Sequence, residues 1–135
     1  QDVPYRRSYD LEEEHDNIEC TWIEVLFPKS KGIMIGNIYR PPDTSKYLDS
    51  DFNDKLDEVL NAVSDEKKEI LLLGDLNCNF LESACKRQLK RVFSMHGLKQ
   101  IIQNVTRITK SSASLIDIPL SSNPGRIIKS KVIKK

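Results

Sequence analysis

The chain has 135 residues, of which 39% are hydrophobic and 30% are charged, and its formal net charge is +1. This composition is ordinary for one globular domain or part of one. The sequence has no signal-peptide pattern and no apolar run long enough to span a bilayer, so we expect an intracellular protein, nuclear or cytoplasmic, with no membrane partner.

The cysteine pattern argues against a disulfide framework and against a zinc site. Cys20, Cys78 and Cys85 are an odd number and show no Cys-x-x-Cys spacing. The two histidines, His15 and His96, belong to no cluster of metal ligands. We therefore expect reduced thiols.

Charge is distributed unevenly along the chain. Residues 1–85 carry 9 Lys/Arg and 19 Asp/Glu, whereas residues 86–135 carry 12 Lys/Arg and a single Asp. Such a separation suggests that the later part faces a polyanion, with nucleic acid as the obvious candidate. Alternatively, the two parts neutralise each other across a shared interface or lie along solvated faces.

The first half of the chain predicts a hairpin after a polar start. Residues 1–17 are polar and acidic and predict a surface connector that contributes nothing to a core. Alternating apolar residues then predict a strand over 17–25. A turn at 28–32 leads into a second buried strand, 33–39, which stops at the prolines that follow Arg40.

A crossover connection is predicted next. Apolar residues at helical spacing predict a helix over 52–63, with Ser50 or Asp49 as its N-cap. The aliphatic run of residues 70–73 predicts a short strand that is buried on both faces in the middle of a sheet. Strand, helix and strand in this order indicate an α/β fold.

The second half continues the alternation of helix and strand. We expect a helix from about Glu82 to Met95 with Gly97 as its C-cap, and a return to the sheet over 98–105. A basic, hydroxyl-rich loop at 106–112 precedes a strand at 114–118, a turn at 121–125 and a half-buried strand at 126–135. Pro119 is unusual so close to a central strand.

Asp75 and Asn77 are the first candidates for chemistry. Gly74 allows a sharp turn after the aliphatic strand, and both polar residues then stand at the strand's carboxyl end, where ligands collect in open α/β sheets. The alternative is an ordinary turn, because Asp and Asn favour turns through local hydrogen bonds.

Three motifs occur in order: Asn37-Ile38-Tyr39-Arg40-Pro41-Pro42, Gly74-Asp75-Leu76-Asn77 and Ser114-Leu115-Ile116-Asp117. The set resembles the endonuclease/exonuclease/phosphatase superfamily, and most of all the endonuclease domain of non-LTR retrotransposons. The resemblance extends from about Asn17 to the last residue. It implies part of a two-sheet β-sandwich flanked by helices, the DNase-I-like four-layer architecture, incomplete at both ends.

The resemblance assigns catalytic roles to four residues. Asp75 would orient or deprotonate the attacking water or hold a divalent ion, since Mg²⁺ prefers hard oxygen ligands. Asn77 would hydrogen-bond the scissile phosphate, and Tyr39 would donate its phenolic hydrogen to a phosphate oxygen; taken alone, Tyr39 could equally be a core or interface tyrosine. Asp117 would hold a catalytic histidine in its useful orientation.

The resemblance also implies DNA contacts. Arg107 and Thr109 would lie on a hairpin that contacts DNA, with phosphate as the safer expectation. Arg40 and Ser114, which belong to the matching motifs, are further candidates for DNA binding.

Two parts of the family pattern are missing from the chain. The family has an N-terminal half with an Asn and a metal-binding Glu, and a Ser-Asp-His near its end; neither is present. We therefore expect Mg²⁺ or Mn²⁺ as the cofactor, with the main ligand outside this chain. The expected partners are DNA, the missing segments of the same domain and a reverse transcriptase domain that follows.

The leading hypothesis is a fragment, inactive alone, of a metal-dependent DNA endonuclease that nicks target DNA for retrotransposition. One alternative is a phosphatase or phosphodiesterase of the same superfamily that acts on inositol or lipid phosphates. Another is a non-catalytic remnant that binds nucleic acid. Because one sheet would lack strands, we also expect an exposed apolar sheet surface.

Overall fold

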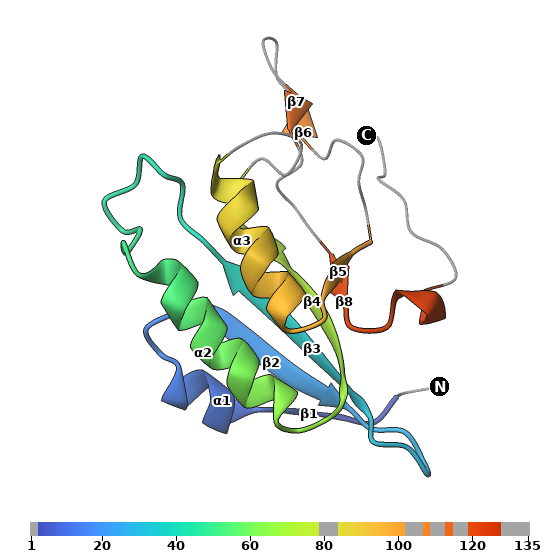
Figure 1. The fold of residues 1–135 in the computed structure, drawn as a ribbon. Coiled ribbons are helices and arrows are strands. Elements are labelled where there is room, and N and C mark those ends of the chain that lie inside the picture. The colour runs from blue at the N-terminus through green and yellow to red at the C-terminus, as the bar shows by residue number, and fades with distance from the viewer. Residues whose placement is uncertain (1–2, 79–83, 102–106, 109–112, 115–118, 128–135) are drawn as a thin grey trace.

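A mixed sheet of six strands, flanked by helices, is the main feature of the fold (Figure 1). The computed structural model describes residues 3–78, 84–101, 107–108, 113–114 and 119–127. The strand order is β1-β2-β3-β4-β8-β5, and β6 and β7 form a separate two-stranded ribbon. The elements are β1 (Tyr5–Arg7), α1 (Tyr9–Glu14), β2 (Cys20–Val25), β3 (Ile33–Tyr39), α2 (Phe52–Ser64), β4 (Glu69–Asp75), α3 (Ala84–Met95), β5 (Lys99–Gln100), β6 (Arg107–Ile108), β7 (Ala113–Ser114), β8 (Leu120–Ser121) and the 3₁₀ turn η1 (Pro124–Arg126).

The central part of the fold follows the sequence-based prediction. β2 and β3 form the expected antiparallel hairpin, and β3, α2 and β4 form the expected crossover with parallel strands. The apolar side of α2 is buried, as its spacing predicts; it consists of Phe52, Leu56, Val59, Leu60 and Val63. The α/β prediction is therefore confirmed, whereas the described residues contain one large sheet, so the second sheet of a sandwich remains a prediction.

The helix α2 begins at Phe52, where it was predicted, but its N-cap differs from the prediction. Its N-cap is Asp51 rather than Ser50 or Asp49, and the Asp51 side chain makes no capping hydrogen bond. The carboxylates of Asp49 and Asp51 instead lie 2.7 and 3.4 Å from the Lys55 ammonium group. An ion pair thus takes the place of the predicted cap.

The stretch 1–17 is more than the surface connector that was expected. β1 pairs antiparallel with β2 at the edge of the sheet, and α1 places Leu11 in the hydrophobic core. The prediction that this stretch contributes nothing to the core was therefore wrong. A three-residue strand and a single apolar residue are too short to give a periodic signal.

The strand β4 is buried on one face only. Ile70 and Leu72 pack beneath the helices, but Leu73 on the other face is 40% exposed. The prediction of burial on both faces was wrong because α2 and α3 lie on the same side of the sheet (Figure 1). The opposite face carries a row of half-buried or exposed aliphatic side chains, so the expected apolar sheet surface is present: Ile23, Val25, Ile33, Ile35, Leu71 and Leu73.

The end of the sheet differs from the prediction. Gly97 adopts φ +68° after α3, and β5 returns to the sheet as expected. Ser121, predicted in a turn, lies in β8, which pairs with both β4 and β5. Pro119 fits beside this strand because it precedes β8 and its carbonyl accepts a hydrogen bond from Ile101. The predicted strands at 114–118 and 126–135 lie mostly outside the described residues.

No helix in the described part of the chain combines the length and the apolar content that a membrane crossing requires.

Close packing between β2 and β3 leaves no space at Gly36. The Trp22 side chain is fully buried and lies directly over Gly36, so that a Cβ atom at this position would overlap the indole ring. We expect Gly36→Ala to lower the free energy of unfolding by about 1–3 kcal/mol, the usual cost of overpacking.

Urea unfolding followed by the fluorescence of Trp22, the one tryptophan, measures this cost. Gly125→Ala is the control, because a Cβ there meets only ordinary contacts. Equal unfolding midpoints for the two variants would contradict the packing argument.

A buried carboxylate joins β1, β2 and the start of β4. Glu24 is 4% exposed, and its two oxygens lie 2.6 Å from the Lys68 ammonium group and 2.7 Å from the Arg6 guanidinium. The hydrogen bond from Lys68, helped by Arg6, holds the pKa of Glu24 below its usual range, although burial opposes this shift.

A lowered pKa in the folded state predicts how stability depends on pH. The contribution of Glu24 is present above its ordinary pKa of about 4.5 and is lost as the pH falls through the folded-state value. We expect Glu24→Gln to remove up to about 1.4 kcal/mol per pH unit from the acid slope of the unfolding free energy. Unfolding curves between pH 3 and 6 test this, with the exposed Glu58→Gln as the control.

Candidate active site

Tyr39 and Asp75 lie side by side at the carboxyl ends of neighbouring strands. β3 and β4 are parallel, and these two residues are the last pair of their register. Directly paired residues project from the same face, here the face opposite the helices. Tyr39 is 38% exposed, and Asp75 is half-buried. The pairing thus brings the phenol and the carboxylate to one open edge of the sheet.

Gly74 shapes the end of β4. Its φ is +147°, and a Cβ at this position would collide with the Ile38 carbonyl oxygen on β3. Only glycine fits both the backbone conformation and this close approach of two strands. β4 continues through Gly74 to Asp75, so the sharp turn that the sequence predicted at Gly74 comes after Asp75 instead.

A side-chain turn fixes Asn77 relative to Asp75. The Asn77 backbone N–H donates to Asp75 Oδ1 at 3.0 Å, and Asn77 has φ +46°, which Asn tolerates better than most residues. Asn77 Nδ2 donates to the Arg40 carbonyl oxygen at 2.8 Å. A side-chain amide carries two N–H donors, and this hydrogen bond to Arg40 uses one of them. Asp75 Oδ2 has no hydrogen-bond partner among the described residues.

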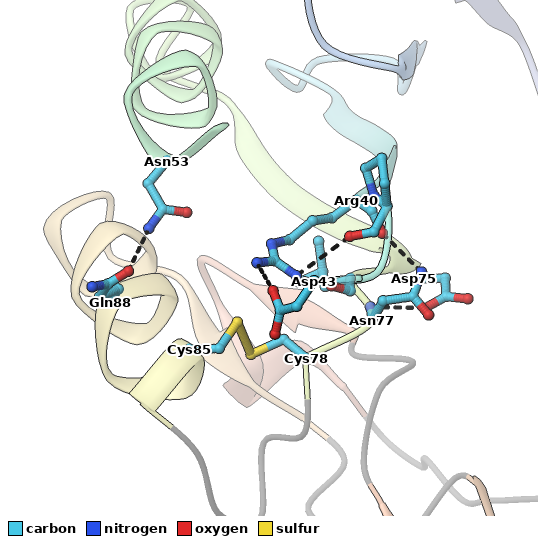
Figure 2. A network of polar contacts seen from close by, with 10 residues as sticks. Arg40, Asp43, Asn53, Asp75, Asn77, Cys78, Cys85 and Gln88 are labelled. Atoms are coloured by element: carbon cyan, nitrogen blue, oxygen red, sulfur yellow. Dashed lines mark hydrogen bonds and ion pairs between the residues drawn. A yellow bond between two sulfur atoms is a disulfide. The ribbon is translucent and has the colours of Figure 1, made fainter. Parts of the chain in front are cut away.

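The Arg40 side chain extends from beside this turn toward Asp43 (Figure 2) and is buried. The residue is 8% exposed; its Nη1 donates to the Leu76 carbonyl oxygen at 3.3 Å, and its Nη2 lies 2.6 Å from Asp43 Oδ1. The DNA contact predicted for Arg40 is untested, but the burial of its guanidinium argues against it. Asp43, which the sequence motifs did not single out, is the partner that the prediction missed.

The remaining predicted site residues lie in the later part of the chain. Arg107 and Ser114 are opposite each other in the β6–β7 ribbon, which is the hairpin that the sequence predicted. Thr109 and Asp117 lie outside the described residues. The structure therefore brings together Tyr39, Asp75 and Asn77, with Arg40 beside them.

A pocket of about 470 Å³ lies next to Tyr39, between the start of β2 and the loop that follows β3. Its walls combine the aromatic side chains of Tyr39 and Tyr47 with the carboxylates of Asp16 and Glu19. Sequence reasoning did not identify this pocket, because its residues come from loops with no shared motif. An acidic wall repels phosphate, so the pocket suits uncharged groups better than anions.

A disulfide links the candidate site to α3. Cys78, one residue after Asn77, is bonded to Cys85 on α3, while Cys20 is a free thiol (Figure 2). The prediction of three reduced thiols was therefore wrong. The spacing of seven residues is not a recognised motif, and the turn and the helix meet only in the folded chain.

The fit of a divalent cation can be judged from the donor atoms. The described residues contain no group of three or more His, Cys, Asp or Glu side chains that could hold a metal ion. Asp75 offers one carboxylate oxygen of the hard type that Mg²⁺ prefers. The described residues thus fit a cation that takes one ligand from Asp75 and its other ligands elsewhere.

Comparison with a family model gives a match over most of the chain. Residues 33–134 match the model of the endonuclease-reverse transcriptase family. The matched range includes the β3–α2–β4 crossover and all the predicted site residues. No curated protein sequence matches the chain.

Comparison with solved structures identifies similar folds. The endonuclease domain of TRAS1, a telomere-specific non-LTR retrotransposon, aligns with a TM-score of 0.66 at 14% identity, covering 89% of this chain and 56% of that domain. A β-hairpin deletion mutant of beta toxin from Staphylococcus aureus aligns with a TM-score of 0.61 at 10% identity, covering 87% and 49%. An endonuclease/exonuclease/phosphatase family protein from Leptotrichia buccalis has a TM-score of 0.56 at 13% identity, covering 76% and 42%.

These structures have the DNase-I-like fold that the sequence predicted, and identities this low support the fold alone. The chain spans about half the length of each of these three structures.

The disulfide leads to a simple prediction about the number of free thiols. Unfolded without reductant, the chain should show one thiol that reacts with a chromogenic disulfide reagent, and three after reduction. Cys20→Ala should bring the unreduced number to zero. Reduction should also lower the free energy of unfolding by about 2 kcal/mol, as expected for a short closed loop. Three reactive thiols before reduction would exclude the disulfide.

Proposed function

Because this chain belongs to the endonuclease-reverse transcriptase family, we propose that it forms the later part of a metal-dependent DNA endonuclease domain. The domain nicks target DNA and so provides the primer for reverse transcription by a reverse transcriptase domain of the same polypeptide. The observation that carries this proposal is the meeting of Tyr39, Asp75 and Asn77 at one open edge of the sheet.

Each of these side chains has a suitable role in phosphodiester hydrolysis. The Asp75 carboxylate orients the attacking water or accepts its proton through Oδ2. The second N–H of the Asn77 amide donates to a phosphate oxygen and adds no negative charge there. The Tyr39 hydroxyl donates to another phosphate oxygen. A bound Mg²⁺ or Mn²⁺ would add a counter-charge for the developing oxyanion, with Asp75 as one ligand.

Asp117 completes the set proposed for catalysis. Its carboxylate would orient a histidine that another part of the domain supplies, and this arrangement fixes the tautomer of the imidazole. A beta toxin structure among the similar folds contains bound magnesium ions, which is consistent with a divalent cation in this fold.

DNA is the proposed substrate because of the charge distribution. The later part of the chain, residues 86–135, is strongly basic. The β6–β7 ribbon carries Arg107 and Ser114, Thr109 follows β6 in the sequence, and we assign phosphate contacts to these three residues. Apart from Tyr39, Asp75 and Asn77, the acidic first part would then lie away from the DNA backbone. We propose a location inside the cell, nuclear or cytoplasmic, where such a substrate is available.

The rest of the same domain is the proposed partner of the open sheet face. The face opposite the helices carries six aliphatic side chains on β2, β3 and β4, and a sheet packed against it would bury them in the manner of a sandwich. We propose that this partner also supplies the main metal ligand. The isolated 135-residue chain is then inactive.

Nicking of supercoiled plasmid tests both parts of the proposal. The 135-residue chain with Mg²⁺ should not nick, whereas the longer polypeptide with the flanking segments should. Asp75→Ala in that longer polypeptide should reduce the rate by about 100- to 1000-fold, the usual effect of losing an acid–base group or an electrostatic stabiliser. Asp54→Ala, an exposed substitution on α2, is the control and should have no effect.

Three results would overturn the proposal. Multiple-turnover nicking by the short chain that Asp75→Ala abolishes would refute its inactivity. Hydrolysis of inositol phosphates in preference to plasmid would replace the nuclease with a phosphatase. Salt-dependent DNA binding without cleavage, unchanged by Asp75→Ala and Asn77→Ala, would indicate a module that only binds.

A further inference from the structure

The turn from Asp75 to Asn77 is held from one side by a single residue, Arg40. We propose that Arg40 is a positioning residue, which fixes the Asp75 carboxylate and the Asn77 amide relative to each other, and that its charge does not bind DNA. The inference rests on the proposed function only for its effect on catalysis. The geometry of the turn is independent of that function.

The backbone of Arg40 holds both ends of the turn. Its N–H donates to the Asp75 carbonyl oxygen at 2.9 Å, and its carbonyl oxygen accepts the Asn77 side-chain N–H at 2.8 Å. A single residue at the end of the neighbouring strand therefore sets the spacing between the two candidate catalytic residues. A shift of Arg40 would move both of them.

The side chain of Arg40 holds the middle of the turn. Nη1 donates to the carbonyl oxygen of Leu76, the residue between the two candidates, at 3.3 Å. Asn77 adopts φ +46°, a left-handed conformation that Asn tolerates better than most residues and that constraints from its surroundings hold in place. The Arg40 guanidinium supplies one of these constraints, because its hydrogen bond holds the carbonyl group of Leu76, the residue directly before Asn77.

The guanidinium is itself anchored to the loop after β3. Nη2 lies 2.6 Å from Asp43 Oδ1, Nη1 lies 3.5 Å from the Pro41 carbonyl oxygen, and the Phe52 ring at the start of α2 lies 5.7 Å away. Only 9% of the Arg40 side chain is exposed. It is therefore poorly placed to reach a DNA phosphate, but well placed to connect the turn to the loop (Figure 2).

A lysine at position 40 cannot make the same set of contacts. The planar fork of arginine reaches the Leu76 carbonyl and the Asp43 carboxylate at the same time, whereas an ammonium group is a single point of contact. Arg40 Nε is buried without a hydrogen-bond partner among the described residues. Keeping a buried, incompletely paired guanidinium is costly, which is consistent with a role other than stability.

The position of the turn can be measured without any catalytic assay. In the isolated chain, we expect Arg40→Lys and Arg40→Gln to shift the ¹⁵N-edited NMR signals of the Asn77 side-chain amide and to speed their exchange with water at least 10-fold. The Asn53 side-chain amide, which donates to Gln88 between α2 and α3, is the internal control and should not move. Unchanged Asn77 signals in both variants would overturn the proposal.

Nicking kinetics of the longer polypeptide separate positioning from DNA binding. Positioning predicts that Arg40→Lys and Arg40→Gln both lower kcat by about 10- to 100-fold, because small misplacements of catalytic groups are costly. The KM and the salt dependence of DNA binding should stay unchanged. A DNA contact predicts instead that Arg40→Lys is active and that Arg40→Gln weakens binding. Lys31→Gln, at an exposed position in the turn between β2 and β3, is the control for loss of a surface cation.

A milder variant provides a second test in case the Arg40 variants do not fold. Asp43→Asn keeps Arg40 in place but removes its ion pair, and Asp43 is 66% exposed, so this variant should fold. We expect a smaller drop in kcat in the same direction, at least 3-fold. If the wild-type polypeptide does not nick at all, the proposed function fails, and the NMR measurement still decides the role of Arg40.

Discussion

Parallel pairing of β3 with β4 is the constraint on which the rest of the structure depends. The register runs from Ile33 beside Glu69 to Tyr39 beside Asp75. Parallel strands end at the same edge of a sheet, so the crossover through α2 carries the chain back and brings two distant motifs together. The candidate site is therefore a direct consequence of strand direction, and a slip by one residue would send Asp75 to the face under the helices.

The two faces of the sheet differ in packing and exposure. Beneath α2 and α3, close packing of Trp22 over Gly36 and the paired Glu24 carboxylate leave little freedom for substitution. The opposite face is apolar and open, and it ends at the edge that carries Tyr39 and Asp75. A rigid, covered face thus supports an edge where the chain can interact with a partner or a substrate. If the proposed function holds, the covered side supplies the positional precision that catalysis needs.

Local patterns predicted the elements with strong periodicity and missed contacts that only the folded chain creates. Apolar spacing was sufficient for β2, β3, α2 and β4, and the order of the motifs was sufficient for the family. Apolar spacing could not show that α1 contributes Leu11 to the core, because a helix of six residues is too short for a clear hydrophobic periodicity. The disulfide of Cys78 with Cys85 and the burial of Arg40 also escaped prediction, because each depends on how a loop folds back against its neighbours.

The position of β8 has a consequence for the order of assembly. β8 lies between β4 and β5 in the sheet, although β5 precedes it in the chain. Residues 99–100 pair with Leu120 and Ser121, and these in turn pair with Leu71 and Leu72. During synthesis, β5 therefore leaves the ribosome before its strand partner exists. The hairpin and crossover can form early from nearby contacts, whereas this side of the sheet closes late, when the distant segment arrives.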